Sequence, residues 1–215
     1  MLKMYSKYSK VIEFDKLTDP TQTWDLQELI GEGTYGEVYA VKNKQTGQLA
    51  AAKIMENIHE TVEEIEQEYQ ILKAVSCHPN FPQFYGLYLK KDTKMDDQLW
   101  IIMELCTNGS VTDLSKDLVT QNRRMDEVLI AFILRETLKA INYMHKNHYI
   151  HRDIKGHNIL MTNDGSIKLV DFGVSGLLKS TLAPRRTSVG TPYWMAPEVR
   201  EFQSIIDNVY GTSDQ

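Results

Sequence analysis

The chain has 215 residues, of which 42% are hydrophobic and 25% are charged, with a formal net charge of -5. This length suits one large or two small domains, and the apolar fraction is enough for a buried core. The acidic balance supplies no basic field for a phosphate backbone, so we expect no nucleic-acid partner. The apolar runs are too short to cross a bilayer and the N-terminus has no hydrophobic signal segment, so we expect a cytoplasmic protein without a membrane span.

The cysteine content is low. Cys77 and Cys106 are the two cysteines of the chain, and no CxxC motif or suitably spaced histidine accompanies them. We therefore expect ordinary reduced thiols rather than a disulfide or a metal thiolate site.

The first half of the chain predicts a small lobe of strands with one helix. Residues 1–23 show no sustained period and are expected to be a loosely held leader, with a domain beginning near Trp24. Strand-like runs follow at 25–30, 37–43, 48–55, 84–89 and 99–105. Between the third and fourth runs, residues 60–74 carry apolar side chains at helical spacing, namely Val62, Ile65, Tyr69 and Leu72.

The second half begins with helical patterns. Ser110 and Asp113 have the spacing of a capping box and open a short helix. A long helix is predicted over 126–146, and one apolar face of it carries Ala131, Leu134, Leu138 and Ile141. Residues 159–161 and 167–170 then flank a turn at 163–165, which predicts a short β-hairpin.

A glycine-rich turn lies between the first two predicted strands. Gly31, Gly33 and Gly36 form a GxGxxG pattern, in which missing side chains let backbone amides approach phosphate groups. A dinucleotide-binding fold would need a helix directly after Gly36, whereas a strand is predicted there. The remaining alternative to a nucleotide phosphate site is a plain glycine hairpin.

Lys53 lies in an otherwise apolar strand. Its ammonium group should point inward and needs an anionic partner, unless it is a strand-end lysine that reaches solvent. ATP phosphates and a helix carboxylate would satisfy it. Of the nearby acids, Glu68 shares the packed helix face with Ile65 and Leu72, so we predict this pairing over the other candidates Glu63, Glu64 and Glu66.

Three polar residues in the second half suit phosphoryl transfer. Asp153 could orient and deprotonate an acceptor hydroxyl, while Asn158 and Asp171 could hold Mg²⁺ against the phosphates. Each alone could be a turn-forming residue, but their joint pattern with Lys53 favours phosphoryl transfer. Lys155 could neutralise charge on the transferring group. His151 is interpreted as a packed histidine beneath Phe172 rather than a general base.

The motifs at 31–38, 151–158, 171–173 and 196–198, in this order, resemble the eukaryotic protein kinase family. The resemblance implies an α+β, two-lobed fold: a five-stranded antiparallel N-lobe with one helix (24–105), a hinge (104–109) and a mainly helical C-lobe (110–215). It also implies ATP and Mg²⁺ as cofactors, and Lys155 is typical of serine/threonine kinases.

By the same resemblance, Met103 is the gatekeeper, 104–106 form the hinge that binds adenine, and Val38, Ala51 and Leu160 are walls around the base. Leu72, Leu87, His151 and Phe172 correspond to the regulatory spine. The full ATP site implied by the resemblance comprises Ile30, Gly31, Glu32, Gly33, Thr34, Tyr35, Gly36, Glu37, Val38, Ala51, Lys53, Glu68, Met103, Glu104, Cys106 and Leu160.

Within the family, residues 109–114 and 187–195 resemble the germinal-centre group of Sterile-20-like kinases. Residues 19–24, 64–69 and 168–175 are similar to the N-terminal kinase of class III myosins. This resemblance implies a parent protein that is an actin-based motor, with protein serines and threonines as substrates. The myosin motor, actin and calmodulin become expected partners, in the cytoplasm or on the actin cytoskeleton.

The segment after Asp171 resembles an activation segment. Arg185 and Arg186 lie beside Thr187, so we predict Thr187 as an activating phosphosite whose phosphate pairs with Arg152. Thr191 is expected to hydrogen-bond toward Asp153 and Lys155 and to shape the acceptor site.

The sequence after Glu198 is shorter than in the family. We expect the helix that would pair with Glu198 and cover Leu134, Leu138 and Ile141 to be missing, with Asp214 a candidate for the aspartate that steadies the catalytic loop. The small lobe should then fold better than the remainder. Two functions remain open: a serine/threonine protein kinase, or a truncated, catalytically weak or inactive module that binds nucleotides or partners.

Overall fold

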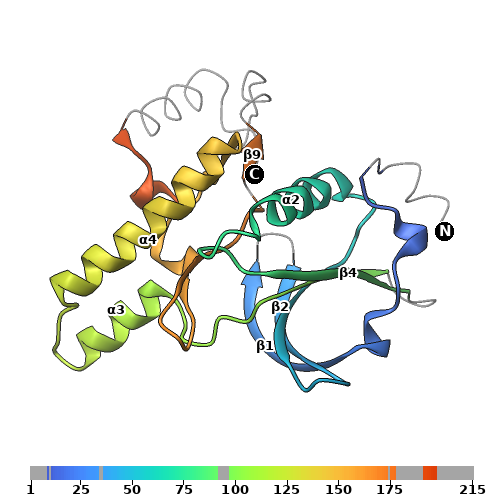
Figure 1. Cartoon of the computed structure of the whole chain (residues 1–215), viewed down its shortest axis with the longest axis horizontal. Helices are drawn as coiled ribbons and strands as arrows, with labels where there is room; N and C mark the ends of the chain where they lie inside the picture. Colours follow the sequence, from blue (N-terminus) through green and yellow to red (C-terminus); the bar gives the residue numbers. More distant parts are fainter. Residues whose placement is uncertain are drawn as a thin grey trace, which may run out of the picture.

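The computed structural model describes residues 9, 11–33, 36–91, 97–173, 175–177 and 191–197. Five strands form one antiparallel sheet in the order β1-β2-β3-β5-β4, and helix α2 lies against one of its faces (Figure 1). This confirms the predicted five-stranded lobe with one helix. The elements are β1 (Trp24–Gly33), β2 (Gly36–Asn43), β3 (Leu49–Met55), α2 (Val62–Val75), β4 (Phe84–Lys90) and β5 (Gln98–Met103).

Strand β3 is the central strand of this sheet and is buried on both faces. Only Leu49 at its start is exposed, which explains its continuous apolar sequence. Met55 belongs to the larger core cluster together with Ile65 and Leu72 of α2. Ala52 belongs to a second cluster that includes Trp100. The sheet therefore separates two apolar layers, and its strands are held rigidly between them.

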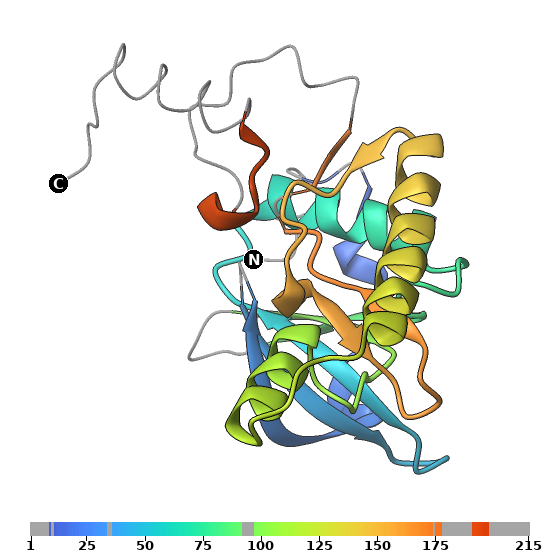
Figure 2. The same ribbon diagram turned by 90° about the vertical axis from the view of Figure 1, so that its left-hand side faces the viewer.

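The helices of the second half lie beyond the end of the sheet (Figures 1 and 2). Helix α3 (Val111–Thr120) begins with the predicted capping box: Ser110 Oγ accepts from Asp113 N at 3.1 Å, and Ser110 N donates to Asp113 Oδ2 at 3.0 Å. Helix α4 (Glu127–Lys146) is capped by Asp126, whose Oδ1 accepts from Val128 N at 2.7 Å. The capping box was predicted from the sequence, whereas the Asp126 cap was not.

The buried face of α4 differs from the one predicted. The residues that pack are Ile133, Thr137, Ala140 and Met144, whereas Leu134 and Leu138 are 55% and 62% exposed. The helix is apolar around much of its circumference, so its period alone could not select the packed side.

Short strands carry the loops of interest. Strands β7 (Ile159–Met161) and β8 (Ile167–Leu169) form the predicted hairpin, and Gly165 adopts a positive φ of 81° in its turn. Strand β6 (Tyr149–Ile150) pairs with β9 (Gly176–Leu177), which the sequence did not predict. The segment between β6 and β7 contains the short 3-10 helix η3 (Gly156–Asn158).

The expected loosely held leader is wrong for residues 11–23. Ile12 and Phe14 are 3% and 0% exposed and belong to the larger core cluster. Two 3-10 turns, η1 (Phe14–Lys16) and η2 (Pro20–Gln22), shape this segment, and Asp19 caps the second by accepting from Thr21 N at 2.8 Å. The sequence period does not reveal this segment, because its buried residues Ile12, Phe14 and Pro20 form no sustained repeat.

Several predicted residues lie outside the described part of the chain: Thr34, Tyr35, Thr187, Glu198 and Asp214. Among the described helices, none has the length and apolar character that a membrane crossing requires.

Candidate active site

A cavity of about 560 Å³ lies between the sheet, the segment after β5 and the β7–β8 hairpin. Apolar walls come from both sides, and the charged residues Lys53, Glu68 and Asp171 form one cluster in it. Of the residues predicted for the ATP and metal sites, Gly36 and Glu37 do not line it. Those that do are Ile30, Gly31, Glu32, Val38, Ala51, Lys53, Glu68, Met103, Glu104, Cys106, Asn158, Leu160 and Asp171.

The glycine-rich strands cover one wall of this cavity. Gly31 is paired with Val38, and Gly33 with Gly36, in the β1–β2 register. A Cβ on Gly36 would collide with the carbonyl oxygen of Ile54 on the neighbouring strand β3, whereas one on Gly31 would meet no atom within 4 Å. Gly36 is therefore required by strand packing, whereas the missing side chain of Gly31 leaves free space beside this wall of the cavity.

Lys53 and Glu68 form a buried ion pair. The Nζ atom of Lys53 lies 2.6 Å from Oε1 and 2.8 Å from Oε2 of Glu68, and the two side chains are 5% and 4% exposed. The predicted choice of Glu68 among the helix acids is thus confirmed geometrically, because only this one turns from α2 toward β3. Both charges of such a buried pair lose their hydration, so each must be neutralised at close range by the other.

Asp171 extends the charged end of the cavity. Its Oδ1 lies 3.8 Å from Lys53 Nζ and accepts from Gly173 N at 3.3 Å. Asp171 adopts a left-handed backbone with φ 65°, a conformation that non-glycine residues rarely adopt. Such conformations concentrate at functional sites, where the surrounding structure enforces them.

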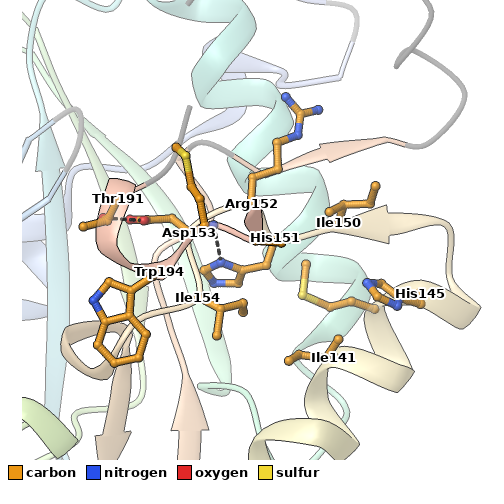
Figure 3. Close-up of a pocket in the computed structure, with 12 residues that line it drawn as sticks. Ile141, His145, Ile150, His151, Arg152, Asp153, Ile154, Thr191 and Trp194 are labelled. Atoms are coloured by element: carbon orange, nitrogen blue, oxygen red, sulfur yellow. Dashed lines mark hydrogen bonds between the residues drawn. The ribbon is translucent and has the colours of Figure 1, made fainter. Parts of the chain in front are cut away.

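Asp153 is the centre of a second polar cluster, and Figure 3 shows its side chain directed at Thr191. Its Oδ1 accepts from Thr191 Oγ1 at 2.7 Å, and its Oδ2 lies 2.7 Å from Lys155 Nζ. The Lys155 ammonium also donates to Thr191 Oγ1 at 3.3 Å. The structure therefore places Thr191 where the sequence expected it, between Asp153 and Lys155.

The pKa of Asp153 lies below the ordinary aspartate value. Partial burial by itself raises this pKa, but the Lys155 ammonium and the hydrogen bonds from Thr191 and Asn158 favour the carboxylate more strongly. Asp153 is consequently ionised at neutral pH. An ionised carboxylate can accept a hydrogen bond from an acceptor hydroxyl and orient it.

His151 supports this cluster from behind. Its Nε2 donates to Val170 O at 2.9 Å, and its Nδ1 accepts from Asp153 N at 3.3 Å, which defines a neutral tautomer. Burial lowers its pKa, and the ring packs edge-on against Phe172 with centroids 5.7 Å apart. The interpretation of His151 as a packed residue rather than a base is confirmed.

Asn158 and Asp171 fit the oxygen chemistry of a magnesium site. The amide nitrogen of Asn158 donates to Asp153 O at 2.9 Å and Oδ2 at 3.2 Å, which leaves its amide oxygen as the metal donor. Both side chains line the same cavity. No group of three or more His, Cys, Asp or Glu that could hold a metal occurs in the described ranges, but Mg²⁺ needs only one or two protein oxygens beside phosphates and water.

The hinge carries an ion pair that the sequence did not predict. Lys168 of β8 is 8% exposed, and its Nζ lies 2.8 Å from Glu104 Oε2 and 3.3 Å from Phe81 O. Glu104 Oε2 also accepts from Gln83 N at 3.0 Å. The available signal was a lysine between the buried residues of a short strand, which needs a partner as Lys53 does.

Cys106 lines the cavity near this hinge. Burial, and then the negative charge of Glu104, raise the pKa of its thiol to about 12. The thiol therefore stays protonated and acts as a small polarizable wall.

A second cavity of about 420 Å³ lies on the other side of Asp153 (Figure 3). Asp153, Thr191 and Trp194 line it, while the nearby Tyr193 is 96% exposed. Figure 3 shows the Arg152 side chain pointing away from Trp194. Asp153 thus lines this second cavity, while its hydrogen-bond partner Asn158 lines the larger one.

Comparisons with known proteins agree with this geometry. The chain matches the protein kinase domain profile over residues 24–211. It is 54% identical to human (Homo sapiens) myosin-IIIa over 207 residues, which cover 96% of the chain and 13% of that protein. It is 48% identical to Mus musculus myosin-IIIb over 93% of the chain and 15% of that protein.

A kinase without a myosin name also matches. Misshapen-like kinase 1 of Rattus norvegicus is 47% identical over 90% of the chain and 14% of its own length. The chain thus spans between about an eighth and a seventh of the length of these relatives.

Proposed function

The chain belongs to the protein kinase domain family, and from this premise we propose that it transfers the γ-phosphoryl group of ATP to serine or threonine hydroxyls of proteins. The observation that carries the proposal is the position of Asp153. Its ionised carboxylate, held by Lys155 and Thr191, lines the second cavity, and its hydrogen-bond partner Asn158 lines the nucleotide-sized one.

The roles of the site residues follow from their positions. The apolar walls Val38, Ala51 and Leu160 suit an adenine ring, beside the backbone of 104–106. Lys53, steadied by Glu68, would hold phosphate oxygens at the polar end of the cavity. We propose that the kinase domain comprises residues 24–215, with the N-lobe at 24–105 and the hinge at 104–109.

The metal role belongs to Asn158 and Asp171. Bound Mg²⁺ supplies charge neutralisation at the phosphates. Asp171 also lies near Lys53. The phosphate chain would therefore meet the Lys53 ammonium directly and the Asp171 carboxylate through the bound metal. Asn158 orients Asp153 as well through its amide nitrogen, which links metal binding to the geometry of the base.

Proton handling falls to Asp153. It would accept a hydrogen bond from the substrate hydroxyl and take its proton as the phosphoryl group moves, while Lys155 offsets the negative charge. Thr191 donates to the same carboxylate and fixes its rotamer. We propose Thr187, outside the described residues, as the activating phosphosite.

The parent protein is proposed from similarity. The relatives named myosin-IIIa and myosin-IIIb support a class III myosin kinase, with the myosin motor, actin and calmodulin as partners and a location in the cytoplasm on the actin cytoskeleton. Serine/threonine specificity of the Sterile-20-like type is proposed from residues 109–114 and 187–195, whose sequences resemble that group.

Phosphoryl transfer to a generic basic protein tests the proposal. With radiolabelled ATP and Mg²⁺, we expect label on serine and threonine but not on tyrosine, and a loss of at least about 100-fold in Asp153→Asn and Asp171→Asn. The control Asp117→Asn changes an exposed aspartate of α3 and should keep full activity. Nucleotide binding without any transfer by the wild type would instead support the regulatory binding module.

A further inference from the structure

We propose that residues 11–18 are a positioning segment of the active site, in which Phe14 holds helix α2, and through it Glu68, in register with Lys53. This inference rests on the proposed function, since it assigns to these residues a part in arranging the phosphate-binding lysine. Phe14 touches no reacting group, so it is a positioning residue rather than a catalytic one.

The first observation is the burial pattern. Ile12 and Phe14 are 3% and 0% exposed, while Glu13, between them, faces solvent. Both buried residues join the cluster that contains Ile65 and Val75 of α2. A fully buried aromatic side chain represents a large apolar contact area in a short segment that also carries Glu13, Asp15 and Lys16. The segment is therefore anchored into the core rather than laid over it.

The second observation is that this segment bridges two elements. Val11 N donates to Glu66 Oε1 of α2 at 3.4 Å, and Leu89 N of β4 donates to Thr18 O at 3.1 Å. Strand β4 is the edge of the sheet. Figure 1 shows this dark blue segment passing beside the end of α2 and then along that edge. The segment thus ties the helix to the sheet, with Phe14 between the two ties.

The third observation concerns α2 itself. Thr61 at its N-cap makes no side-chain capping hydrogen bond, so local capping contributes little to fixing this end of the helix. Neighbouring residues of α2 reach three different partners. Glu66 meets the leader, Gln67 Nε2 donates to Ser175 O at 2.7 Å, and Glu68 pairs with Lys53. A shift of the helix must therefore disturb all three contacts together.

The consequence for catalysis follows from distance. The bond of 2.6 Å between Lys53 and Glu68 tolerates little movement of α2 before the ammonium loses its partner. A misplacement of about 1 Å at a positioning group can lower a rate by roughly 100-fold. The packing of Phe14 is accordingly part of what orients Lys53.

The test compares three variants of the full chain. Phe14→Ala removes the anchor, Phe14→Leu keeps an apolar side chain there, and Val41→Ala removes buried volume from the other apolar cluster. At temperatures of equal folded fraction, we expect Phe14→Ala to lower phosphoryl transfer by roughly 10- to 100-fold. Phe14→Leu and Val41→Ala should stay within roughly threefold of the wild type. An equal loss in Val41→Ala would overturn the proposal.

A double-mutant cycle with Glu68→Gln separates positioning from general stability. If Phe14 acts through Glu68, then the double variant should be slower than Glu68→Gln alone by a factor of less than roughly three. Multiplying effects in the double variant would contradict the inference, because they would mean that Phe14 acts independently of the ion pair.

Two further readouts need no phosphoryl transfer. Phe14→Ala should accelerate amide hydrogen exchange in α2 but not in β2, and should weaken the binding of a fluorescent ADP analogue. Unchanged exchange in α2 together with unchanged binding would refute the positioning role. An inactive wild type would count against the proposed function alone, since these two measurements would still decide the inference.

Discussion

Lys168 and Glu104 join the β7–β8 hairpin to the hinge through a contact of 2.8 Å between Nζ and Oε2. Their side chains are 11% and 25% exposed, so the pair is mostly withdrawn from water. The same carboxylate oxygen accepts from Gln83 N, which adds the loop before β4 to the junction. The hinge is thus held by charge as well as by its covalent connection.

Replacing Lys168 by methionine should destabilise the protein. The change leaves the Glu104 carboxylate without its ammonium partner, and we expect a loss of roughly 1 to 3 kcal/mol in the free energy of unfolding, less than for a fully buried pair. Urea denaturation measures it. The matched control Lys139→Met removes a half-exposed ammonium from Glu136, which Arg135 still contacts, and should cost less than about 0.5 kcal/mol. Equal losses would show that the hinge pair contributes no more to the free energy of unfolding than the control pair does.

Gly36 and Gly31 should respond differently to alanine. A Cβ at Gly36 collides with a backbone carbonyl oxygen of β3, and backbone cannot yield as a side chain can, so we expect a loss of about 2 kcal/mol or more in stability. Gly31→Ala meets open space and should stay within about 0.5 kcal/mol. Thermal unfolding without nucleotide compares the two, and a tolerated Gly36→Ala would disprove the register of β2 against β3.

His151 should make folding sensitive to mild acid. Because burial lowers its pKa in the folded state, the unfolded chain binds a proton first as the pH falls below about 6.5. Protonation of His151 therefore leaves the free energy of unfolding unchanged above that pH. Below it, the free energy of unfolding decreases by at most about 1.4 kcal/mol per pH unit. The denaturation midpoint between pH 7.5 and 5.5 measures this decline. A His151→Phe variant should show a flatter profile, and an unchanged slope would argue against a neutral His151.

The two cysteines should differ in alkylation. Cys106, with a pKa of about 12, is almost entirely protonated at pH 7.5, and the thiolate is the reactive form. Cys77 is exposed. Mass spectrometry after iodoacetamide treatment should find Cys77 modified first, with Cys106 modified only at much higher pH. A Cys77→Ser variant isolates the slower site, and rapid labelling of that variant at pH 7.5 would contradict the buried thiol.

Thr187 should control activity if the proposed phosphosite is right. Active protein should carry phosphate there, and Thr187→Ala should lower phosphoryl transfer by roughly 10-fold or more, since a phosphate can order a loop by pairing with arginine. Phosphopeptide mapping together with initial rates checks both statements. Ser188→Ala is the neighbouring control and should have little effect, so activity that survives in Thr187→Ala would reject the assignment.

Much of the architecture was predictable because local physical rules set it. Alternation and apolar runs located all five strands of the sheet, the capping box located the start of α3, and apolar spacing located α4. The choice of Glu68 for Lys53 followed from helix periodicity alone. These features depend on residues that are near one another in the chain or on one repeating face.

The face of α4 and the leader show where such reasoning stops. An apolar helix offers more than one plausible buried side, and the packing partners of α4 decide which is used. Ile12 and Phe14 carry too short a pattern to predict burial before α2 and the sheet edge are known. The pairing of β6 with β9 was missed for the same reason.

The sequence by itself determined the chemistry of this protein: its glycine loop, buried lysine, acidic residues and their order specify a protein kinase domain. Only the tertiary structure decided how these groups are supported, through the Lys168–Glu104 pair, the Thr191 hydroxyl on Asp153 and the anchor of Phe14. The physical reason is distance along the chain. Motifs are local and can be read in order, whereas supporting contacts join segments that only folding brings together.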